Sequence, residues 1–299
     1  MKLLRWGRAE YEDQPFENLG VDVVEDSSDD PALEEADFLV VPSRRRVDAA
    51  VVSRLKNCKL VLTTTSGHDH LDLDALGAAG IPAARLPLAR RDAVVQTALG
   101  MLLMLSRRLG HFYVATEQER WRRAELPQIG ATLLGTVGIV GAGVIGRRMA
   151  EVLAPLAEQV LICDPRHPAH QPLAELLQRC DALTLHCPLN PSTRLLFRED
   201  LLQKMRPGSI LVNTARGKIL DPRAAMAAVH SGHLAGLGID VFPVEPCSLL
   251  PFAHPAVIAS PHAAGWHPRL GEAIVTGLRE AIRAVQQGQP IPFRLSPGD

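Results

Sequence analysis

The sequence has no surplus of charge of either sign. It holds 32 Lys and Arg residues against 33 Asp and Glu residues among 299, which gives a formal net charge of −1. Nucleic-acid binding requires a basic surface that neutralises phosphates, so this balance argues against a nucleic-acid partner. Long apolar runs are also missing. The longest, residues 98–105, is far shorter than the roughly 20 residues of a membrane-spanning helix, so we expect no membrane partner.

Cysteine is scarce and shows no pairing pattern. The five cysteines are odd in number and form no C-x-x-C pair. This argues against a disulfide framework and a structural zinc site, and favours a reducing compartment. The first six residues include Lys2 and Arg5, which is too much early charge for a signal peptide. We therefore expect a cytoplasmic protein without a metal site.

The first third of the chain alternates short apolar runs with helical patterns. Such alternation is typical of βαβ units on a parallel sheet. Two helical stretches and a Pro- and Gly-containing connector follow. The predicted strands are residues 21–24, 38–41 and 60–64; the predicted helices are 48–55, 72–79, 92–107 and about 112–122; the connector is 126–130.

A second alternating series begins at residue 137. Two such series in 299 residues favour two domains, because a single core stops growing at about this length. The predicted class is α/β, with two doubly wound parallel-sheet domains and a cleft between them. The predicted strands are residues 137–140, 160–163, 182–185, 210–212, 236–239 and 256–259, and the helices are 145–153, 198–205, 221–230 and 270–287.

A glycine-rich turn joins the strand at residues 137–140 to the next helix. A lone G-x-G-x-x-G is weak evidence, but this one has a strand before it and a helix after it. Gly141 permits a tight turn, Gly143 lets backbone approach a pyrophosphate, and Gly146 lets the helix pack close to the strand. Phosphates would face N–H groups at the helix N-terminus. The predicted dinucleotide-binding residues are Gly141, Gly143, Val144, Ile145 and Gly146.

The strand after this loop ends at Asp164, 18 positions beyond Gly146. An acid about 20 residues after the glycines is typical of a group that bonds the ribose hydroxyls. A carboxylate there repels a 2′-phosphate, so NAD is the predicted cofactor. Arg166 is two residues away and is able to accept such a phosphate, which leaves dual use of NAD and NADP open.

Three polar residues follow successive strands of the second series. Arg216 comes after residues 210–212, Glu245 follows the strand that ends near Asp240, and His262 follows residues 256–259. Each alone is more often an exposed side chain. Together they share one position, because the carboxyl ends of strands in an open α/β sheet line the ligand crevice.

These three residue types suit one reaction. Arg grips a carboxylate or keto oxygen through two parallel hydrogen bonds. The ordinary histidine pKa, about 6.5, lets an imidazole give or take a proton near neutrality. A carboxylate on its other ring nitrogen fixes the tautomer and stabilises the imidazolium. Arg216, Glu245 and His262 are therefore the predicted catalytic residues for hydride transfer between a dinucleotide cofactor and a 2-hydroxy or 2-keto acid.

Several motifs in one order resemble a known family over nearly the whole chain. They are residues 137–146, 185–189, 205–217, 240–246 and 261–265. The chain resembles the D-isomer-specific 2-hydroxyacid dehydrogenases, which use NAD. The resemblance implies a Rossmann-like and a flavodoxin-like domain. It implies a discontinuous substrate domain, residues 1–97 with 268–299, and a dinucleotide-binding domain, residues 98–267.

The resemblance also implies residue roles. Arg216 would orient the substrate, Glu245 would pair with the histidine, and His262 would donate the proton. Asp240 would bond the nicotinamide carboxamide. Further cofactor-lining positions are Cys187, Thr214, Ala215 and Gly265. Substrate-side positions are Ser43 and the loop residues Thr65, Ser66 and Gly67, whose backbone N–H groups would hold the substrate carboxylate.

Departures from the family pattern leave the substrate open. Members often have Arg-Ser where this chain has Pro42-Ser43, and Asn where it has Arg90. Two arginine pairs, 44–45 and 90–91, would favour a dianionic substrate if they faced the cleft. A solvated basic surface is the interpretation we favour, because Arg is mostly exposed unless paired.

Alternatives remain within the same fold. An erythronate-4-phosphate-like or phosphite-like enzyme would keep the cofactor and change the small acid. Formate enzymes use a Gln–His pair, and Glu245 argues against them. A non-enzymatic, dinucleotide-sensing corepressor-like protein is the alternative of another class. The segment from Trp121 to Gly135 resembles an arm that wraps a partner subunit, so we expect a homodimer.

Overall fold

The computed structural model describes residues 1–7, 16–29, 31–117 and 134–297. Trp121, most of the segment that resembles a subunit-wrapping arm, and the predicted connector at 126–130 lie outside the described residues. The chain divides into two compact units. Unit 1 comprises Met1–Arg90 with Trp266–Asp299, and unit 2 comprises Arg91–Gly265. Unit 1 is therefore assembled from two stretches of chain that unit 2 separates in sequence.

Unit 1 is a six-stranded sheet in the order β12-β5-β4-β3-β1-β2. Its first five strands are parallel, and β12 pairs antiparallel with β5 at one edge. The order of the parallel strands, 2-1-3-4-5, is the flavodoxin-like doubly wound order. The strands are β1 (Lys2–Trp6), β2 (Asp22–Asp26), β3 (Phe38–Val41), β4 (Leu60–Thr63), β5 (Ala83–Arg85) and β12 (Arg294–Leu295).

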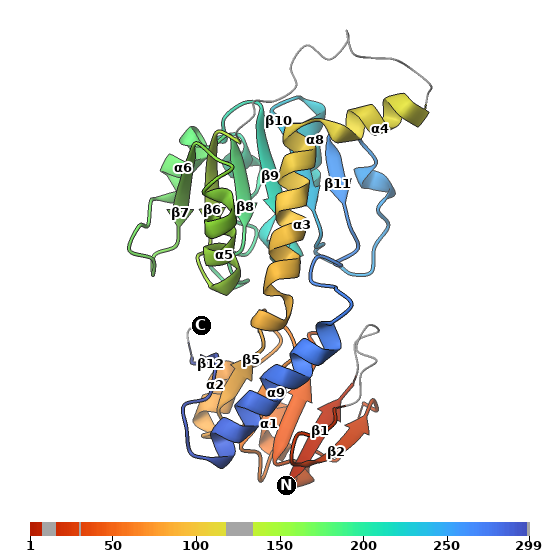
Figure 1. The fold of residues 1–299 in the computed structure, drawn as a ribbon, viewed down its shortest axis with the longest axis vertical. Helices are drawn as coiled ribbons and strands as arrows, with labels where there is room; N and C mark the ends of the chain where they lie inside the picture. Colours follow the sequence, from red (N-terminus) through yellow and green to blue (C-terminus); the bar gives the residue numbers. More distant parts are fainter. Residues whose placement is uncertain (8–15, 30, 118–133, 298–299) are drawn as a thin grey trace. The chain divides into compact units, whose positions relative to one another are not determined.

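Helices cover both faces of the unit 1 sheet. On one face α9 (Leu270–Gln286) lies across the strands (Figure 1), and its buried Ile274 and Leu278 pack against Phe38 and Leu60. The other face is covered by α1 (Ala49–Arg54) and α2 (Leu73–Ala78). Strands β3 and β4 are buried along their whole length, as expected for central parallel strands that are covered on both sides.

Unit 2 is a six-stranded, all-parallel sheet in the order β11-β10-β9-β8-β6-β7. The chain order reverses between β6 and β8, and in doubly wound sheets ligands bind at such a switch point. The strands are β6 (Thr136–Val140), β7 (Gln159–Cys163), β8 (Ala182–Leu185), β9 (Ser209–Asn213), β10 (Leu234–Ile239) and β11 (Val257–Ala259).

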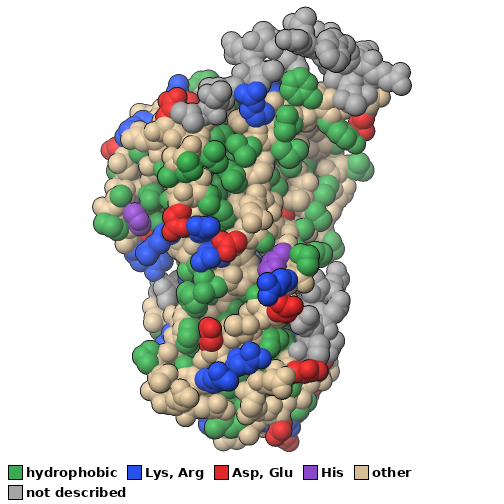
Figure 2. Space-filling view, in the orientation of Figure 1, with side chains coloured by type: hydrophobic (Ala, Val, Ile, Leu, Met, Phe, Trp, Pro, Cys, Tyr) green, Lys and Arg blue, Asp and Glu red, His purple; other side chains and the backbone are tan. Residues whose placement is uncertain are grey.

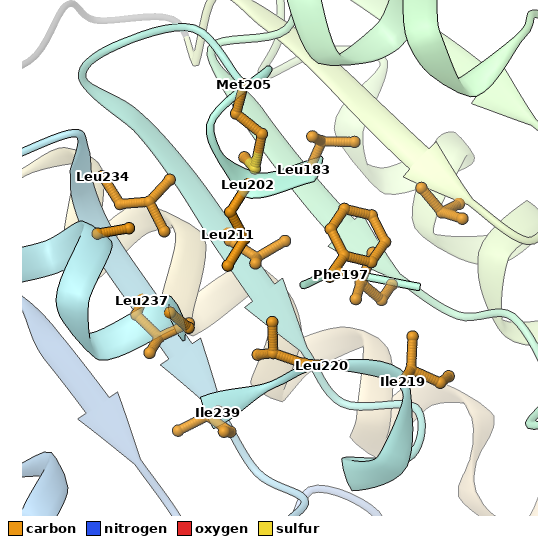
Figure 3. Packing of buried hydrophobic residues seen from close by; sticks show 14 of the residues in the cluster. Leu183, Phe197, Leu202, Met205, Leu211, Ile219, Leu220, Leu234, Leu237 and Ile239 are labelled. Atoms are coloured by element: carbon orange, nitrogen blue, oxygen red, sulfur yellow. The ribbon is translucent and has the colours of Figure 1, made fainter. Parts of the chain in front are cut away.

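The two faces of the unit 2 sheet carry separate cores. On one face α3 (Leu88–Ser106) and α5 (Val144–Leu153) pack over Val137 and Ile139. On the other face Leu183 and Leu211 of the sheet meet Leu202, Leu220 and the ring of Phe197 (Figure 3). The remaining helices of this unit are α4 (Leu109–Glu117), α6 (Leu173–Arg179), α7 (Glu199–Leu202) and α8 (Pro222–His230).

The two-domain, doubly wound α/β prediction is confirmed, and the helix starts show why most boundaries were predictable. Asp48, Asp72 and Asp221 are N-caps whose carboxylates accept backbone N–H groups of the first turn. The predicted start of the long helix at Asp92 was wrong, because α3 begins four residues earlier at Leu88. The carboxylate of Asp92 bonds Arg91 and Arg148 instead of capping a helix.

Four of the α-helices and strands among the described residues were missing from the sequence prediction: β1, β5, α6 and β12. Strand β1 contains Lys2 and Arg5, so it lacks a continuous apolar run. Yet Arg5 is 1% exposed, because its guanidinium bonds Glu25 at 3.1 Å and lies over the ring of Phe16.

Charged side chains of both signs are interspersed on the face drawn in Figure 2. No helix among the described residues combines the length and apolar character needed to cross a membrane.

Candidate active site

The glycine loop of unit 2 runs from the end of β6 into α5. A Cβ atom on Gly146 would lie 1.9 Å from Gly141 O, and one on Gly141 would lie 2.5 Å from Cys187 N. A Cβ atom on Gly143 would meet nothing within 4 Å. Gly141 and Gly146 are therefore required by packing within the protein, whereas Gly143 borders open space.

The N-terminus of α5 suits an anionic ligand. Its N-cap, Gly143, has no side chain to accept the first N–H groups of the helix. Those donors and the helix dipole favour a phosphate at this end. A second unsatisfied polar group follows β9 in the same sheet. The buried hydroxyl of Thr214 has no hydrogen-bond partner among the described residues. Both features fit a dinucleotide that supplies the missing acceptors.

Asp164, directly after β7, is hydrogen-bonded to the glycine loop. Its carboxylate accepts Ala142 N at 2.7 Å and Arg166 N at 3.0 Å. Burial raises the pKa of Asp164, but these two N–H groups and the charges of Arg166 and His167 outweigh it and hold the pKa below its ordinary value. The acid is thus ionised at neutral pH, with lone pairs left for hydroxyl donors.

Glu245 and His262 form a direct pair. His262 Nδ1 lies 2.6 Å from Glu245 Oε2, and Glu245 Oε1 accepts Phe242 N at 2.8 Å. Burial raises the pKa of Glu245, but the bonds from His262 and Phe242 N and the charges of His262 and Arg216 together lower it. Glu245 therefore stays anionic, and Nδ1 of the imidazole is committed to it.

Arg216 is held on the turn after β9, against the Glu245 segment. Its guanidinium donates to Ala215 O at 2.8 Å, and the Asn213 amide donates to Arg216 O at 3.0 Å. The next residue, Gly217, is so close to Phe242 that a Cβ atom would lie 1.9 Å from its carbonyl carbon. This contact sets the Arg216 turn beside the residues that hold Glu245.

Asp240, which is 1% exposed, organises the His262 segment. Its carboxylate accepts Ser260 Oγ at 2.6 Å, Ala263 N at 2.9 Å and Ala264 N at 3.0 Å. His262 N donates to Asp240 O at 2.7 Å, which holds the histidine at a φ of 54° in the left-handed region. A carboxylate offers about four acceptor sites, so one remains for a further donor.

Other histidines near the site differ from His262 in kind. His186 follows β8, and burial lowers its pKa to about 4, so it is neutral at physiological pH. Its Nε2 lies 3.0 Å from Thr184 Oγ1, a neutral partner. His262 instead faces the carboxylate of Glu245, which is the partner that a proton-exchanging imidazole needs.

The predicted substrate residues lie in unit 1. Ser43 is exposed on the turn after β3, and Thr65, Ser66 and Gly67 follow β4, the neighbouring strand. Thr65 Oγ1 donates to Gly67 O at 2.8 Å and lies 3.0 Å from Thr63 Oγ1. These positions share the carboxyl edge of the unit 1 sheet.

The four arginines whose contacts the sequence left open differ sharply. Arg45 bonds Asp29 at 2.8 Å and lies over the Trp6 ring, and Arg91 bonds Asp92 at 2.8 Å. Arg44 is exposed. Arg90 is 7% exposed and its guanidinium donates to Thr64 O. Three of them are surface or ion-paired side chains, as favoured from the sequence, whereas Arg90 is buried beside the predicted substrate loop.

Two supporting residues escaped sequence reasoning. The Asn213 side chain makes two hydrogen bonds to the backbone of the Arg216 turn. Its amide nitrogen donates to Arg216 O, and its amide oxygen accepts Ala215 N at 3.0 Å. Ser260 bonds Asp240. Asn213 stands at the end of a strand, and an Asn side chain often accepts a hydrogen bond from the backbone N–H two residues further along the chain. This pattern is the sequence signal that would have indicated the role of Asn213. Among the described residues, no group of three or more His, Cys, Asp or Glu side chains is arranged to hold a metal ion.

Comparison with known proteins gives a family match over more than half of the chain. Residues 99–264 match the model of the "D-isomer specific 2-hydroxyacid dehydrogenase, NAD binding domain". This range contains the glycine loop, Asp164, Arg216, Asp240, Glu245 and His262.

Curated relatives align along most of the chain. The D-3-phosphoglycerate dehydrogenase of Mycobacterium bovis is 32% identical over 278 residues, covering 89% of this chain and 52% of the relative. The chain thus spans about half the length of that relative. The hydroxypyruvate reductase of Thermotoga maritima is 33% identical over 221 residues, or 72% of each protein.

A solved structure agrees with the fold. The D-lactate dehydrogenase of Aquifex aeolicus, complexed with NAD and lactic acid, superposes with a TM-score of 0.82. It is 26% identical and covers 96% of both chains.

Proposed function

The chain belongs to the D-isomer specific 2-hydroxyacid dehydrogenase family, and on this premise we propose that it is an enzyme that interconverts a D-2-hydroxy acid and a 2-keto acid. Residues 99–264 form the family's NAD-binding domain, which makes NAD the cofactor. The observation that supports the activity most directly is the 2.6 Å Glu245–His262 pair beside the Arg216 turn.

In the proposed reduction, protonated His262 donates its Nε2 proton to the substrate oxygen, because Nδ1 is engaged by Glu245. Glu245 stabilises the imidazolium and keeps the ring oriented. Arg216 binds the substrate carboxylate and polarises the carbonyl oxygen. In the reverse direction neutral His262 accepts the hydroxyl proton. The nicotinamide ring of the bound cofactor supplies or takes the hydride.

The proposed cofactor site combines the residues around the switch point of unit 2. Gly143 and the N–H groups of Val144 and Ile145 would take the pyrophosphate. Asp164 would take the ribose hydroxyls, and the fourth acceptor site of Asp240 suits the carboxamide. Further positions in this proposal are Gly141, Gly146, Cys187, Thr214, Ala215 and Gly265.

We propose that the discontinuous region, residues 1–97 with 268–299, binds substrate, while residues 98–267 bind the cofactor. Within the former, Ser43 and the loop residues Thr65, Ser66 and Gly67 would hold the acid. The loop has N–H groups and a buried hydroxyl without acceptors, which suits a carboxylate.

A panel of 2-keto acids tests the activity. Oxidation of NADH would be followed with glyoxylate, pyruvate, hydroxypyruvate, phenylpyruvate, 2-ketoglutarate and phosphorylated keto acids. His262→Ala should lose about 10²–10⁴-fold in kcat, the usual worth of general acid–base catalysis, while NADH still binds. His230→Ala, at the exposed end of α8, is the matched control and should keep the wild-type rate.

Near-normal turnover by His262→Ala would contradict the assignment. Turnover confined to erythronate 4-phosphate or phosphite would keep the fold and cofactor and replace the substrate class. NADH binding with no turnover on any acid, accompanied by NADH-dependent peptide binding, would favour the corepressor-like alternative.

We further propose a cytoplasmic homodimer. All five cysteines are free thiols, which suits a reducing compartment. Exposed apolar side chains on α3 and α4 would be covered by a second copy: Leu103, Met104, Leu109 and Tyr113 are 37–66% exposed. Light scattering should give twice the 32.4 kDa chain mass, and Leu109→Glu should halve it.

A further inference from the structure

The loop after β4 has all of its carbonyl oxygens engaged. The Arg90 guanidinium donates to Thr64 O, and Leu86 N donates to Thr65 O at 3.4 Å. Arg85 donates to Ser66 O at 2.9 Å, and the Thr65 hydroxyl donates to Gly67 O at 2.8 Å. Four consecutive acceptors, residues 64–67, are therefore occupied by donors from the protein itself.

Three donors at Ser66 and Gly67 are in the opposite condition, whereas Thr64 N donates to Val41 O at 3.1 Å and Thr65 N to Thr63 Oγ1 at 3.4 Å. The Ser66 hydroxyl is buried, with no hydrogen-bond partner among the described residues. The backbone N–H groups of Ser66 and Gly67 likewise donate to no acceptor in the part of the chain that the structure describes. A buried hydroxyl such as that of Ser66 is normally satisfied, so the unpaired donors of this loop are available to an external acceptor.

From this contrast we propose that Arg85 and Arg90 are positioning residues for an anionic substrate group. Their guanidinium groups hold the carbonyl oxygens of Ser66 and Thr64, which turns the donors of the loop toward the ligand and adds positive charge behind them. This inference rests on the proposed function for the identity of the anion, which is the carboxylate of a 2-keto or 2-hydroxy acid.

The placement of both arginines supports this role. Arg85 is the last residue of β5 and pairs in register with Thr63, the last residue of β4, so its side chain starts one residue from the loop. Arg90 lies in the first turn of α3 and is buried to 7% exposure. Burying a guanidinium is costly unless it is hydrogen-bonded, and Thr64 O supplies an acceptor.

Arginine is suited to this task for a geometric reason. Its guanidinium presents donors in a rigid planar fork, whereas a lysine ammonium is a compact point charge on a flexible four-carbon stem. A lysine therefore keeps the charge but fixes a carbonyl less well. Arg→Lys variants thus separate positioning from charge.

Steady-state kinetics test the inference. Arg90→Met and Arg85→Met should each raise KM for the keto acid about tenfold or more, the effect expected for the loss of one charge-assisted hydrogen bond. The kcat at saturating acid and KM for NADH should stay within about twofold to threefold. The Lys variants should give intermediate KM values. Arg91→Met removes a neighbouring cation that pairs with Asp92 and should leave all parameters unchanged.

Equal losses in kcat and in KM for NADH would overturn the proposal, since a general structural defect affects both. An unchanged KM for the acid in both Met variants would also overturn it. If Arg90→Met fails to fold, the half-buried Arg85 provides the test through Arg85→Met and Arg85→Lys.

Binding of oxalate separates this inference from the proposed function. Calorimetry with the NADH complex measures oxalate affinity without any turnover. Wild-type protein that binds oxalate but reduces no keto acid would refute the activity alone, and the variants would still be compared by Kd. A wild-type loop that binds neither oxalate nor any substrate would refute the anion site itself.

Discussion

Individual charges in unit 2 are held by short, specific bonds. Glu245 is kept anionic by the His262 ring and Phe242 N, and Asp240 is engaged by three donors. These are charge-assisted hydrogen bonds, which are about twice as strong as neutral ones. A single change of charge at either acid should therefore be visible in both rate and stability.

Glu245→Gln should lower kcat by about 10²-fold, because an amide no longer stabilises the imidazolium that the reaction needs. NADH affinity should be unchanged. Glu151→Gln, which removes a surface carboxylate paired with Arg148 in the same unit, serves as the control for activity. A kcat equal to wild type in Glu245→Gln would contradict the role of the carboxylate.

The same variant carries a pH signature in stability. The pKa of Glu245 is lower in the folded protein than its ordinary value of 4.5, so the folded state binds this proton less readily than the unfolded state. Its stabilising contribution is complete above about pH 4.5 and is lost as the pH falls through the folded pKa. The difference in unfolding free energy between wild type and Glu245→Gln should shrink over that window in denaturant titrations. If the difference in unfolding free energy between wild type and Glu245→Gln grows as the pH falls, the pKa of Glu245 is not lowered in the folded protein.

At the scale of elements, the turn from β6 into α5 combines two kinds of glycine. No larger residue fits at position 146, because its Cβ atom would overlap the backbone of Gly141. Gly143 borders open space. Gly146 is therefore required for packing within the protein, and Gly143 leaves the space that the proposed ligand would occupy.

Gly146→Ala should destabilise unit 2 by more than about 2 kcal/mol, because its Cβ would overlap Gly141 O. Gly143→Ala should leave the melting temperature almost unchanged and weaken NADH binding at least about tenfold, since its Cβ would occupy space that backbone leaves for the phosphates. Thermal unfolding and NADH fluorescence titration measure the two effects. Equal NADH affinity in Gly143→Ala would refute this placement of the pyrophosphate.

Sequence patterns predicted the central strands most accurately. Residues 38–41 and 182–185 coincide with β3 and β8, because buried parallel strands are continuous apolar runs. Strand β1 was missed because its buried Arg5 is compensated by Glu25 and Phe16, which are distant in the chain.

In the candidate site, the order of motifs predicted Arg216, Glu245 and His262 as catalytic residues, and the structure brings Glu245 and His262 into contact. The positioning roles that we propose for Arg85 and Arg90 give no signal in the sequence. An arginine gives no local sign of whether it is solvated or bonds a carbonyl 19 or 26 residues away.

At the scale of the whole molecule, the two units have separate cores and different ligands in the proposed reaction. A ligand that binds one folded unit stabilises that unit by mass action. The proposed cofactor residues all belong to unit 2, so the two units should respond differently to NADH alone.

Amide hydrogen exchange in the intact chain should show this difference. With NADH at about 100 times its Kd, amides of β6 and β8 that exchange by unfolding of unit 2 should gain about 2.7 kcal/mol of protection. Amides of β3 and β4 in unit 1 should change little. Equal protection of both sheets would show that NADH binding also stabilises unit 1.

The division of unit 1 between two distant stretches of chain has a consequence for biosynthesis. Strands β1 to β5 are made first, but α9 and β12, which cover one face and one edge of their sheet, are made only after the 175 residues of unit 2. At about 5–20 residues per second, the delay on the ribosome is on the order of 10–30 s. During that time Phe38 and Leu60 lack the helix that buries them in the folded protein. Unit 2 emerges as one continuous stretch and is free to fold first. The nascent N-terminal region is thus the part of the chain with most need of chaperone protection.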